Sequence, residues 1–380
     1  MPKNTLCDLD DFRNQYKNIH GYLSLTVCIF GSITNILNIC VLRTKQMRSP
    51  TNFILIGLAV ADLLVMILYI PFTVHRNIDP RRRLVQHFSY PWACFHKFHA
   101  FSTIVLHSIA CFLTIVLAIW RYIFVSKVSS HGVCSNLKYT VIVIVLTYVI
   151  SPLICLPLLS TFEIISYNHT CKLNGEWVLE KDIRLYDNKS LTKRTMYITN
   201  LNDPQNLSIW LYGVCLRFVP CILLTILTYK IITALLETRR RRMKLLASSN
   251  PLEEMGGKNK QNTIQLYKEN QADRTTRMLL AVLLLFLITE IPQVVIGFGQ
   301  IGALFGEMFL AECYKNLGDV MDMMALTNSA INFILYCTMS RQFRVTFKEI
   351  FKVKAVVKWC HKHPHTPEEQ GVAETKMSLV

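Results

Sequence analysis

The sequence predicts an all-α membrane protein: a bundle of seven transmembrane helices with a short amphipathic eighth helix and a β-hairpin in the second extracellular loop. Of its 380 residues, 52% are hydrophobic, a share above that of most soluble domains. The apolar residues form seven blocks, each reaching the length of about 20 residues that a helix needs to cross a bilayer. Lys and Arg are in excess mainly after blocks one, three and five and in the tail, as expected of loops that face the cytoplasm.

This charge distribution predicts a multi-pass protein of the plasma membrane with its N-terminus outside the cell. The net charge of +16 then anchors inner loops at the lipid surface and does not indicate a nucleic-acid partner. Arg81-Arg82-Arg83, on the predicted outer side, is an exception. The first residues lack the apolar core of a secretory signal, so the first span is expected to insert as its own signal. The predicted parts are an extracellular N-terminus at 1–20, the bundle at 21–337, a membrane-surface helix at 338–359 and a cytoplasmic tail at 360–380.

The first two spans, at about 21–42 and 53–74, carry polar side chains within apolar surroundings. Asn35 lies in the first span, and Asp62 lies near the middle of the second. A charged side chain at that depth costs about 2.5–3.5 kcal/mol. We therefore expect Asp62 to face the bundle interior with polar partners, and Pro71 to kink the outer end of the second helix.

The third span, Cys94 to Val125, is the one around which we expect the bundle to be organised. It begins at an outer cysteine and ends on the motif Trp120-Arg121-Tyr122, so it links an outer binding face to an inner coupling face. The fourth span, at about 137–161, is nearly all Leu or β-branched, and we assign it to packing alone.

The long outer loop at 162–206 combines two signals. An Asn-Gly pair at Asn174-Gly175, between short mixed strands, predicts a hairpin. Three glycosylation sequons, at Asn168, Asn188 and Asn206, support its placement outside the cell. Spans five, six and seven follow at about 207–236, 275–299 and 316–337.

After the last span, Phe343, Phe347 and Phe351 recur every four residues among basic side chains, which predicts a helix lying along the inner leaflet in contact with membrane lipid. Cys360 is a candidate for palmitoylation. The histidines near the C-terminus are interpreted as a solvated tail, so no metal site is predicted.

Four cysteines fall on the predicted outer side, where disulfides persist. They are Cys7, Cys94, Cys171 and Cys313. Spacing alone does not fix their connectivity. Cys94–Cys171 is the first choice, and Cys7–Cys313 is the second.

The order of these motifs resembles that of the rhodopsin-like (class A) G-protein-coupled receptors. The resemblance extends from about residue 21 to 351 and is carried by Asn35, Leu58-x-x-x-Asp62, Cys94, Trp120-Arg121-Tyr122, Pro220, Phe286-x-x-Thr289-Glu290-Ile291-Pro292 and Asn332-Phe333-Ile334-Leu335-Tyr336. The family usually has Asp-Arg-Tyr, Cys-Trp-x-Pro and Asn-Pro-x-x-Tyr, so Trp120, Thr289-Glu290 and Phe333 are departures. Trp-Arg-Tyr combined with Thr-Glu-x-Pro-Gln is similar to invertebrate myosuppressin and FMRFamide-like neuropeptide receptors.

The resemblance implies a receptor, not an enzyme, that transmits the binding of a short amidated peptide to heterotrimeric G proteins, with Gi/o as the expected class. Arrestin, and a PDZ-domain protein at the C-terminus, are further candidate partners. An arginine in the peptide would need an acid, and Asp322 is the deepest of the outer acids, followed by Glu290. We therefore expect Asp322→Asn to weaken the agonist far more than Glu312→Gln. The predicted ligand contacts are His99, Thr103, His107, Arg217, Glu290, Gln293, Asp319 and Asp322.

Arg217 and Glu290 come close beneath the ligand pocket in this family. A lone charge in hydrocarbon costs several kcal/mol, so we expect the two to pair in the resting state with His107 within reach. Opening this pair would be a switch. The alternative is that the pair only fixes the packing.

On the inner side, Trp120 cannot accept hydrogen bonds from Arg121. We expect Asp273 to hold this arginine in the resting state, and its release to expose Arg121 to a G protein with some basal activity. The switch set is completed by Tyr122, Phe286, Pro292, Asn332 and Tyr336. Asn35, Asp62, Asn328 and Ser329 resemble the family's water or sodium cluster, but Ala110 replaces the usual hydroxyl, so no cofactor is expected.

Three other classes of protein were weighed. A channel or transporter would show repeat symmetry or broken helix pairs, and a membrane enzyme would need a metal or nucleophile constellation within the spans. The sequence shows neither pattern. A chemosensory or small-molecule receptor of the same family is the alternative that stays open.

Overall fold

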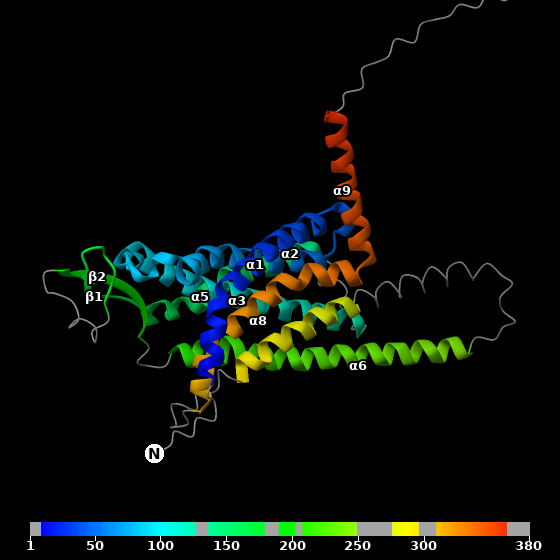
Figure 1. Cartoon of the computed structure of the whole chain (residues 1–380). Coiled ribbons are helices and arrows are strands. Elements are labelled where there is room, and N and C mark those ends of the chain that lie inside the picture. The colour runs from blue at the N-terminus through cyan, green and yellow to red at the C-terminus, as the bar shows by residue number, and fades with distance from the viewer. Residues whose placement is uncertain are drawn as a thin grey trace, which may run out of the picture.

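The computed structural model describes residues 9–126, 136–178, 190–202, 207–248, 276–295 and 309–362. Seven helices in these ranges are long and apolar enough to cross a membrane: Asp11–Leu42, Pro50–Ile78, Tyr90–Val125, Leu137–Thr161, Trp210–Arg240, Thr276–Val295 and Leu317–Met339. Figure 1 shows them running along one elongated bundle, with a β-hairpin at one end and the C-terminal helix at the other. The predicted seven-helix architecture is confirmed.

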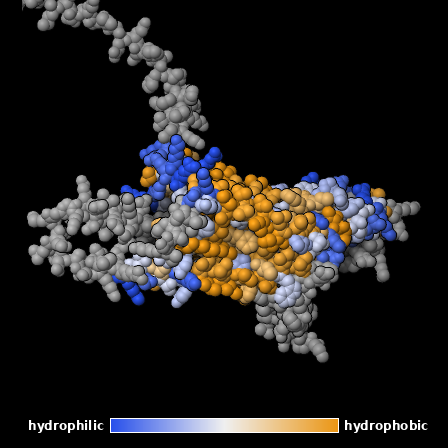
Figure 2. All heavy atoms as spheres, turned by 180° about the vertical axis from the view of Figure 1, so that it is seen from behind, coloured by the Kyte–Doolittle hydropathy of each residue, from blue (hydrophilic) through white to orange (hydrophobic). Residues whose placement is uncertain are grey.

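The middle of the bundle presents an apolar surface. Figure 2 shows a broad band of hydrophobic residues on the visible face, with hydrophilic residues toward both ends. Large side chains such as Ile142, Leu153 and Tyr229 are exposed on the surfaces of the spanning helices. In water such a surface would drive association, whereas in a bilayer it is covered by lipid chains.

The first helix, α1 (Asp10–Leu42), begins well before the predicted span, so part of the segment 1–20 is helical. Phe12, Tyr16 and His20 follow one another at four-residue spacing, which places them on one helix face. The rings of Phe12 and Tyr16 are stacked with centroids 5.8 Å apart, and those of Tyr16 and His20 are 5.5 Å apart. These contacts account for the outward extension of α1.

α2 (Pro50–Thr73) starts at Ser49, whose side chain caps the helix by accepting a hydrogen bond from the backbone N–H of Asn52. Pro71 lies inside α2, and the chain then widens into one turn of π-helix, η2 (Val74–Ile78). Two short 3₁₀ turns, η3 (Pro80–Arg83) and η4 (Val85–Phe88), complete the first outer loop. On the inner side, η1 (Lys45–Met47) joins α1 to α2.

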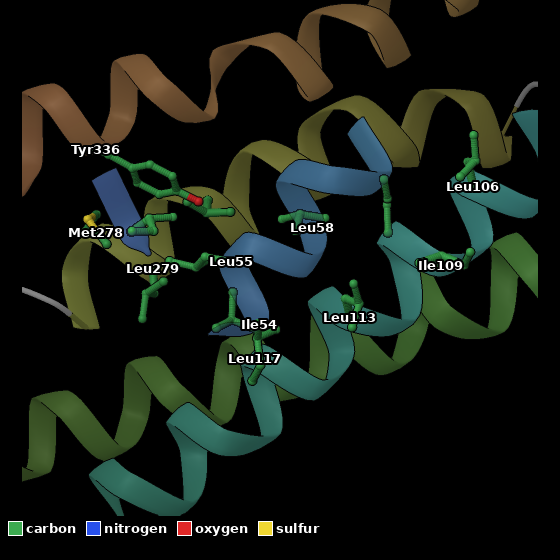
Figure 3. Packing of buried hydrophobic residues seen from close by; sticks show 14 of the residues in the cluster. Ile54, Leu55, Leu58, Leu106, Ile109, Leu113, Leu117, Met278, Leu279 and Tyr336 are labelled. Atoms are coloured by element: carbon green, nitrogen blue, oxygen red, sulfur yellow. The ribbon is translucent and has the colours of Figure 1, made fainter. Parts of the chain in front are cut away.

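α3 (Tyr90–Val125) is the central helix, in contact with α2, α5 (Leu137–Cys155), α6 (Val219–Ser248) and both strands. Figure 3 shows its apolar face packed toward α2 and toward the helix Thr276–Val295. The labelled side chains are Ile54, Leu55, Leu58, Leu106, Ile109, Leu113, Leu117, Met278, Leu279 and Tyr336, all buried. This core holds the outer and inner halves of the bundle in register.

The outer loop contains the short hairpin that the Asn-Gly pair predicted and, in addition, a longer pair of strands. β1 (Phe162–Lys172) follows η5 (Leu156–Thr161) and pairs antiparallel with β2 (Leu191–Leu201). The Asn-Gly turn has Gly175 at φ +85° and folds the chain back, so that Cys171 pairs with Trp177 and the Val178 N–H donates to the Thr170 carbonyl. The main partner strand was missed because its pairing spans a long loop, which local residue patterns do not encode.

The last elements form the other side of the bundle. η8 (Ser208–Phe218) is a π-helix that leads into α6, and α8 (Phe309–Met339) is followed by α9 (Arg341–Lys362). α9 turns away from the bundle axis (Figure 1) and agrees with the predicted surface helix at 338–359. Phe343 is buried against Phe333 and Tyr336, which fixes the start of α9 to the core.

Candidate functional site

A cavity of about 430 Å³ extends from the outer hairpin to the middle of the bundle. Phe162 and Thr199 of the hairpin lie at its rim, and Asp62 and Asn332 lie at its floor. The hydroxyl of Thr199 donates to the carbonyl of Ala93 at 2.8 Å, which fastens β2 to the outer end of α3. The volume is within the range of about 300–1,000 Å³ that is typical of ligand pockets.

The structure brings most of the predicted ligand contacts to this cavity. His99, Thr103, His107, Arg217 and Asp322 line it. Glu290 and Gln293 are buried directly behind two of these residues, as described next. Asp319 precedes Asp322 by about one turn of α8 and is partly exposed.

Glu290 is paired with His107, and the expected direct pair with Arg217 is replaced by two linked contacts. Nε2 of His107 lies 3.3 Å from Oε2 of Glu290, whose side chain is 3% exposed. Neither Nε2 of His107 nor Oε1 of Glu290 has a hydrogen-bond partner among the described residues. The contact is therefore an ion pair when His107 is protonated.

Arg217 meets Gln293 instead, about one helical turn beyond Glu290 on the same helix. Its Nη1 donates to Oε1 of Gln293 at 2.8 Å, and Nε2 of Gln293 donates to the carbonyl of Thr289 at 2.9 Å. The guanidinium also lies 4.7 Å from the ring centroid of Tyr212. The sequence could not distinguish Glu290 from Gln293 as the partner, because both project from one helix toward the same wall.

Asp322 projects into the cavity and is held by a tyrosine that sequence analysis missed. The Tyr69 hydroxyl donates to Oδ2 of Asp322 at 3.4 Å and lies 3.5 Å from Nε2 of His20. These contacts join α1, α2 and α8. The side chain of Asp322 is nonetheless exposed to the cavity, so the carboxylate can accept a further partner.

Histidines and aromatic rings form the outer wall between α2 and α3. His75 is stacked between His87 and Trp92, with ring centroids 3.8 Å and 3.7 Å away. Phe72 and His99 are stacked at 4.0 Å. The i, i+3 spacing of His96 and His99 was the available sequence signal for this wall, but only the fold places α2 against it.

The structure brings the residues of the polar cluster together near the cavity floor. Nδ2 of Asn332 donates to Oδ2 of Asp62 at 3.1 Å. Nδ2 of Asn35 donates to the carbonyl of Ser329 at 2.9 Å, and Asn328 lines the cavity nearby. Ala110 lines the same cavity and carries no hydroxyl. Among the described residues, no group of three or more His, Cys, Asp or Glu is placed to hold a metal ion.

The inner end of the bundle is closed around Arg121. This arginine is 6% exposed, and its Nε has no hydrogen-bond partner among the described residues. Its guanidinium lies 5.6 Å from the ring centroid of Phe124. Asp273, the expected partner, lies outside the described residues. Met278, Leu279 and Tyr336 are buried in one cluster, which keeps the inner end of the helix Thr276–Val295 against the core.

The remaining switch residues lie at different depths of the bundle. Phe286 is buried below His107, with ring centroids 6.4 Å apart. Pro292 lies in the same helix, and Nζ of Lys230 lies 5.9 Å from the Tyr122 ring centroid. Nε1 of Trp120 has no hydrogen-bond partner among the described residues.

The first-choice disulfide is not formed in this structure, because Cys94 and Cys171 are both free thiols. Cys171 is packed with Val85 and Met196 in a small cluster under the hairpin. The alternative pair lies outside what the structure describes, since this covers neither Cys7 nor the side chain of Cys313.

The glycosylation sites can be assessed at one position. Asn168 is exposed in β1, and the Thr195 hydroxyl donates to its side-chain oxygen at 3.0 Å. Asn188 and Asn206 lie outside the described residues, as do the C-terminal residues after 362 and the side chain of Cys360.

Comparisons with known proteins agree with this architecture. The family described as "Serpentine type 7TM GPCR chemoreceptor Srw" matches residues 22–354. The chain is 30% identical over 360 residues to G-protein coupled receptor dmsr-1 of Caenorhabditis elegans, covering 89% of this chain and 69% of that protein. It is 30% identical to the sex peptide receptor of Drosophila melanogaster, covering 90% and 74%. It is also 24% identical to neuromedin-U receptor 2 of Mus musculus, covering 91% and 78%.

Proposed function

The chain belongs to the serpentine seven-transmembrane G-protein-coupled receptors, and from this premise we propose that it is a receptor for a short amidated peptide of the FMRFamide or myosuppressin-like kind. It would signal from the plasma membrane through heterotrimeric G proteins, with Gi/o as the expected class. Relatives named for sex peptide and neuromedin U support a peptide ligand. The observation that carries the proposal is the Asp322 carboxylate, exposed in a cavity that opens beneath the hairpin.

Recognition would centre on an arginine of the peptide. In the resting structure, Asp322 accepts one long hydrogen bond, 3.4 Å from the Tyr69 hydroxyl. A guanidinium can offer two parallel N–H groups to a carboxylate, and such charge-assisted bonds are about twice as strong as neutral ones. The peptide would therefore displace Tyr69 from Asp322 and loosen the contact among α1, α2 and α8.

The signal would pass through the helix Thr276–Val295. Its outer half carries Glu290 and Gln293, which contact the cavity residues His107 and Arg217. Its inner half carries Met278, packed in the cluster that closes the inner face. The two halves belong to one continuous helix, with about 18 Å between residues 290 and 278 at 1.5 Å per residue. A change in the outer contacts therefore moves the inner end as well.

Arg121 would be the output of this movement. It is buried, and its guanidinium neither donates a hydrogen bond to an acidic side chain nor forms an ion pair with one among the described residues. Displacement of Met278 and Leu279 would open a path from Arg121 to the cytoplasm, where the backbone carbonyls of a G-protein segment could accept its hydrogen bonds. Two separated sites coupled by one moving helix satisfy the requirements of an allosteric receptor.

The test is a panel of amidated peptides applied to cells that express the receptor and report cAMP and calcium. We expect at least one peptide ending in an Arg-Phe-amide sequence to activate it, with a fall in cAMP. Asp322→Asn should weaken that peptide at least tenfold, whereas Glu312→Gln should change its potency less than threefold, at matched surface expression. Equal shifts for the two variants would refute the role of Asp322.

A receptor for a small chemosensory molecule is the second candidate. The matching family carries the word chemoreceptor in its description, and the cavity volume suits a small ligand. Activation by a small organic cation, together with silence toward the whole peptide panel, would favour this candidate over a peptide receptor.

A further inference from the structure

The outer wall of the cavity holds a cationic corner that the contacts around Asp322 do not use. Arg76, in the π-helical turn η2, is exposed and lines the cavity. Its guanidinium carbon lies 5.8 Å from the ring centroid of Phe72. No carboxylate forms an ion pair with it in the part of the chain that the structure describes. This guanidinium is open to the cavity.

Two histidines of α3 adjoin Arg76 and present unsatisfied ring nitrogens. His99 is buried, and its Nε2 has no hydrogen-bond partner among the described residues. The same holds for Nε2 of His96, one turn earlier on α3. Both histidines line the cavity, and both lie close enough to Arg76 to interact with it electrostatically. A buried polar atom without a partner costs free energy, so this corner is incomplete without a ligand.

Arg81, in the same loop, differs from Arg76 because its guanidinium is paired with a carboxylate. Its Nε and Nη2 donate to the two carboxylate oxygens of Asp79 at 3.0 Å and 3.1 Å. These hydrogen bonds hold the pKa of Asp79 below its usual range. Arg81 does not line the cavity. The only acid of this loop, Asp79, is therefore paired with Arg81, which does not line the cavity, and not with Arg76.

We propose that Arg76, His96 and His99 form a carboxylate-binding subsite of the ligand cavity. An arginine fork beside two imidazole nitrogens matches the acceptor geometry of a carboxylate, with the guanidinium giving paired N–H groups and each neutral imidazole able to give one. Phe72 stacks on His99 and borders Arg76, which keeps the three groups on one wall. The carboxylate is an acidic side chain of the peptide or its free C-terminus.

The position of the subsite sets its distance from Asp322. Arg76 follows Tyr69, the hydrogen-bond partner of Asp322, by seven residues, which is about 10 Å along a helix. An extended peptide covers that distance in about three residues. The inference rests on the proposed function and adds to it: the peptide carries a cation for Asp322 and an anion about three residues away.

The alternative hypothesis is that Arg76 is an ordinary solvated arginine at a helix end, with no role in ligand binding. Most exposed arginines are of that kind, and removing one changes little. This alternative predicts that Arg76→Gln and Arg81→Gln change the potency of every ligand equally. The subsite predicts that only Arg76→Gln removes a preference for acidic peptides.

The experiment uses amidated Arg-Phe peptides made as twins. In each pair, one peptide carries Asp two, three or four residues before the arginine, and the other carries Asn at the same position. A separate comparison pairs each C-terminal amide with the corresponding free acid. Potency is measured on the full-length receptor and on Arg76→Gln, Arg76→Glu and Arg81→Gln at matched surface expression.

On the unmodified receptor we expect one Asp peptide, or one free acid, to be at least tenfold more potent than its twin. Arg76→Gln should reduce that ratio to below threefold, and Arg76→Glu should invert it in favour of the Asn peptide or the amide. Arg81→Gln should preserve it.

Two results overturn the subsite: a carboxylate preference that survives Arg76→Gln, or no carboxylate preference in any arm although peptides activate the receptor. Silence of the unmodified receptor toward the entire panel overturns the proposed function and the subsite together. A preference for the free acid would keep the subsite and correct the proposal of an amidated ligand.

Discussion

Replacing Glu290 by Gln removes the charge that connects the cavity wall to the moving helix, while the volume of the side chain is kept. Glu290 is buried and lies against His107 on α3. If their attraction stabilises the resting arrangement, its loss shifts the receptor toward the active arrangement. We therefore expect Glu290→Gln to raise basal signalling and to change the response to agonist.

The magnitude follows from the distance and the burial. Nε2 of His107 lies 3.3 Å from Oε2 of Glu290. Two full charges at that distance attract by about 5 kcal/mol at an effective dielectric constant of about 20. Desolvation of the carboxylate offsets much of this attraction, so the net stabilisation by the pair is only a part of it. A loss of about 2 kcal/mol shifts the equilibrium about 30-fold and raises an active share of about 1% to about a quarter.

The assay is basal cAMP in cells that express the receptor without ligand, normalised to surface expression. Glu163→Gln is the matched control, because Glu163 is exposed in β1. A double variant with His107→Gln should add little to Glu290→Gln, since both remove the same contact. If Glu290→Gln leaves expression, basal signalling and agonist response all intact, the pair only fixes the packing and the switch is refuted.

The other predictions concern stability, glycosylation and the inner face. Phe343→Ala should lower the free energy of unfolding by about 3–5 kcal/mol, because Phe343 is 1% exposed in the core. Phe351→Ala is the control, because Phe351 is exposed on the same helix. Equal losses of stability for the two variants in a thermal-shift assay would contradict the anchoring of α9. Asn168→Gln should increase electrophoretic mobility by one glycan, and an unchanged band would show that the exposed sequon is unused. Because Trp120 stands beside Arg121 in place of an acid and cannot accept its hydrogen bonds, basal signalling should exceed that of mock-transfected cells. A level equal to mock would count against a weak brake.

Much of the fold could be predicted because membrane burial is a property of local sequence. A helix must satisfy its own backbone hydrogen bonds in lipid, so apolar length alone marks the spans, and the basic loops orient them. α9 was predicted for a similar reason, since Phe343 and Phe347 fall on one helical face. The outward extension of α1 was missed, because the charges of its first turns outweigh the aromatic spacing of Phe12 and Tyr16.

The amino-acid sequence by itself determined that this chain crosses a membrane, how often, and which charged groups must be sheltered within it. It could not determine which neighbour shelters each group, because that depends on helix rotation and on side chains far apart in the chain. Only the tertiary structure paired Glu290 with His107, gave Arg217 to Gln293, and joined Asp322 to Tyr69. The physical reason is that hydrophobic burial is additive along a segment, whereas a buried charge is stabilised within a few ångströms by whichever group the packing brings there.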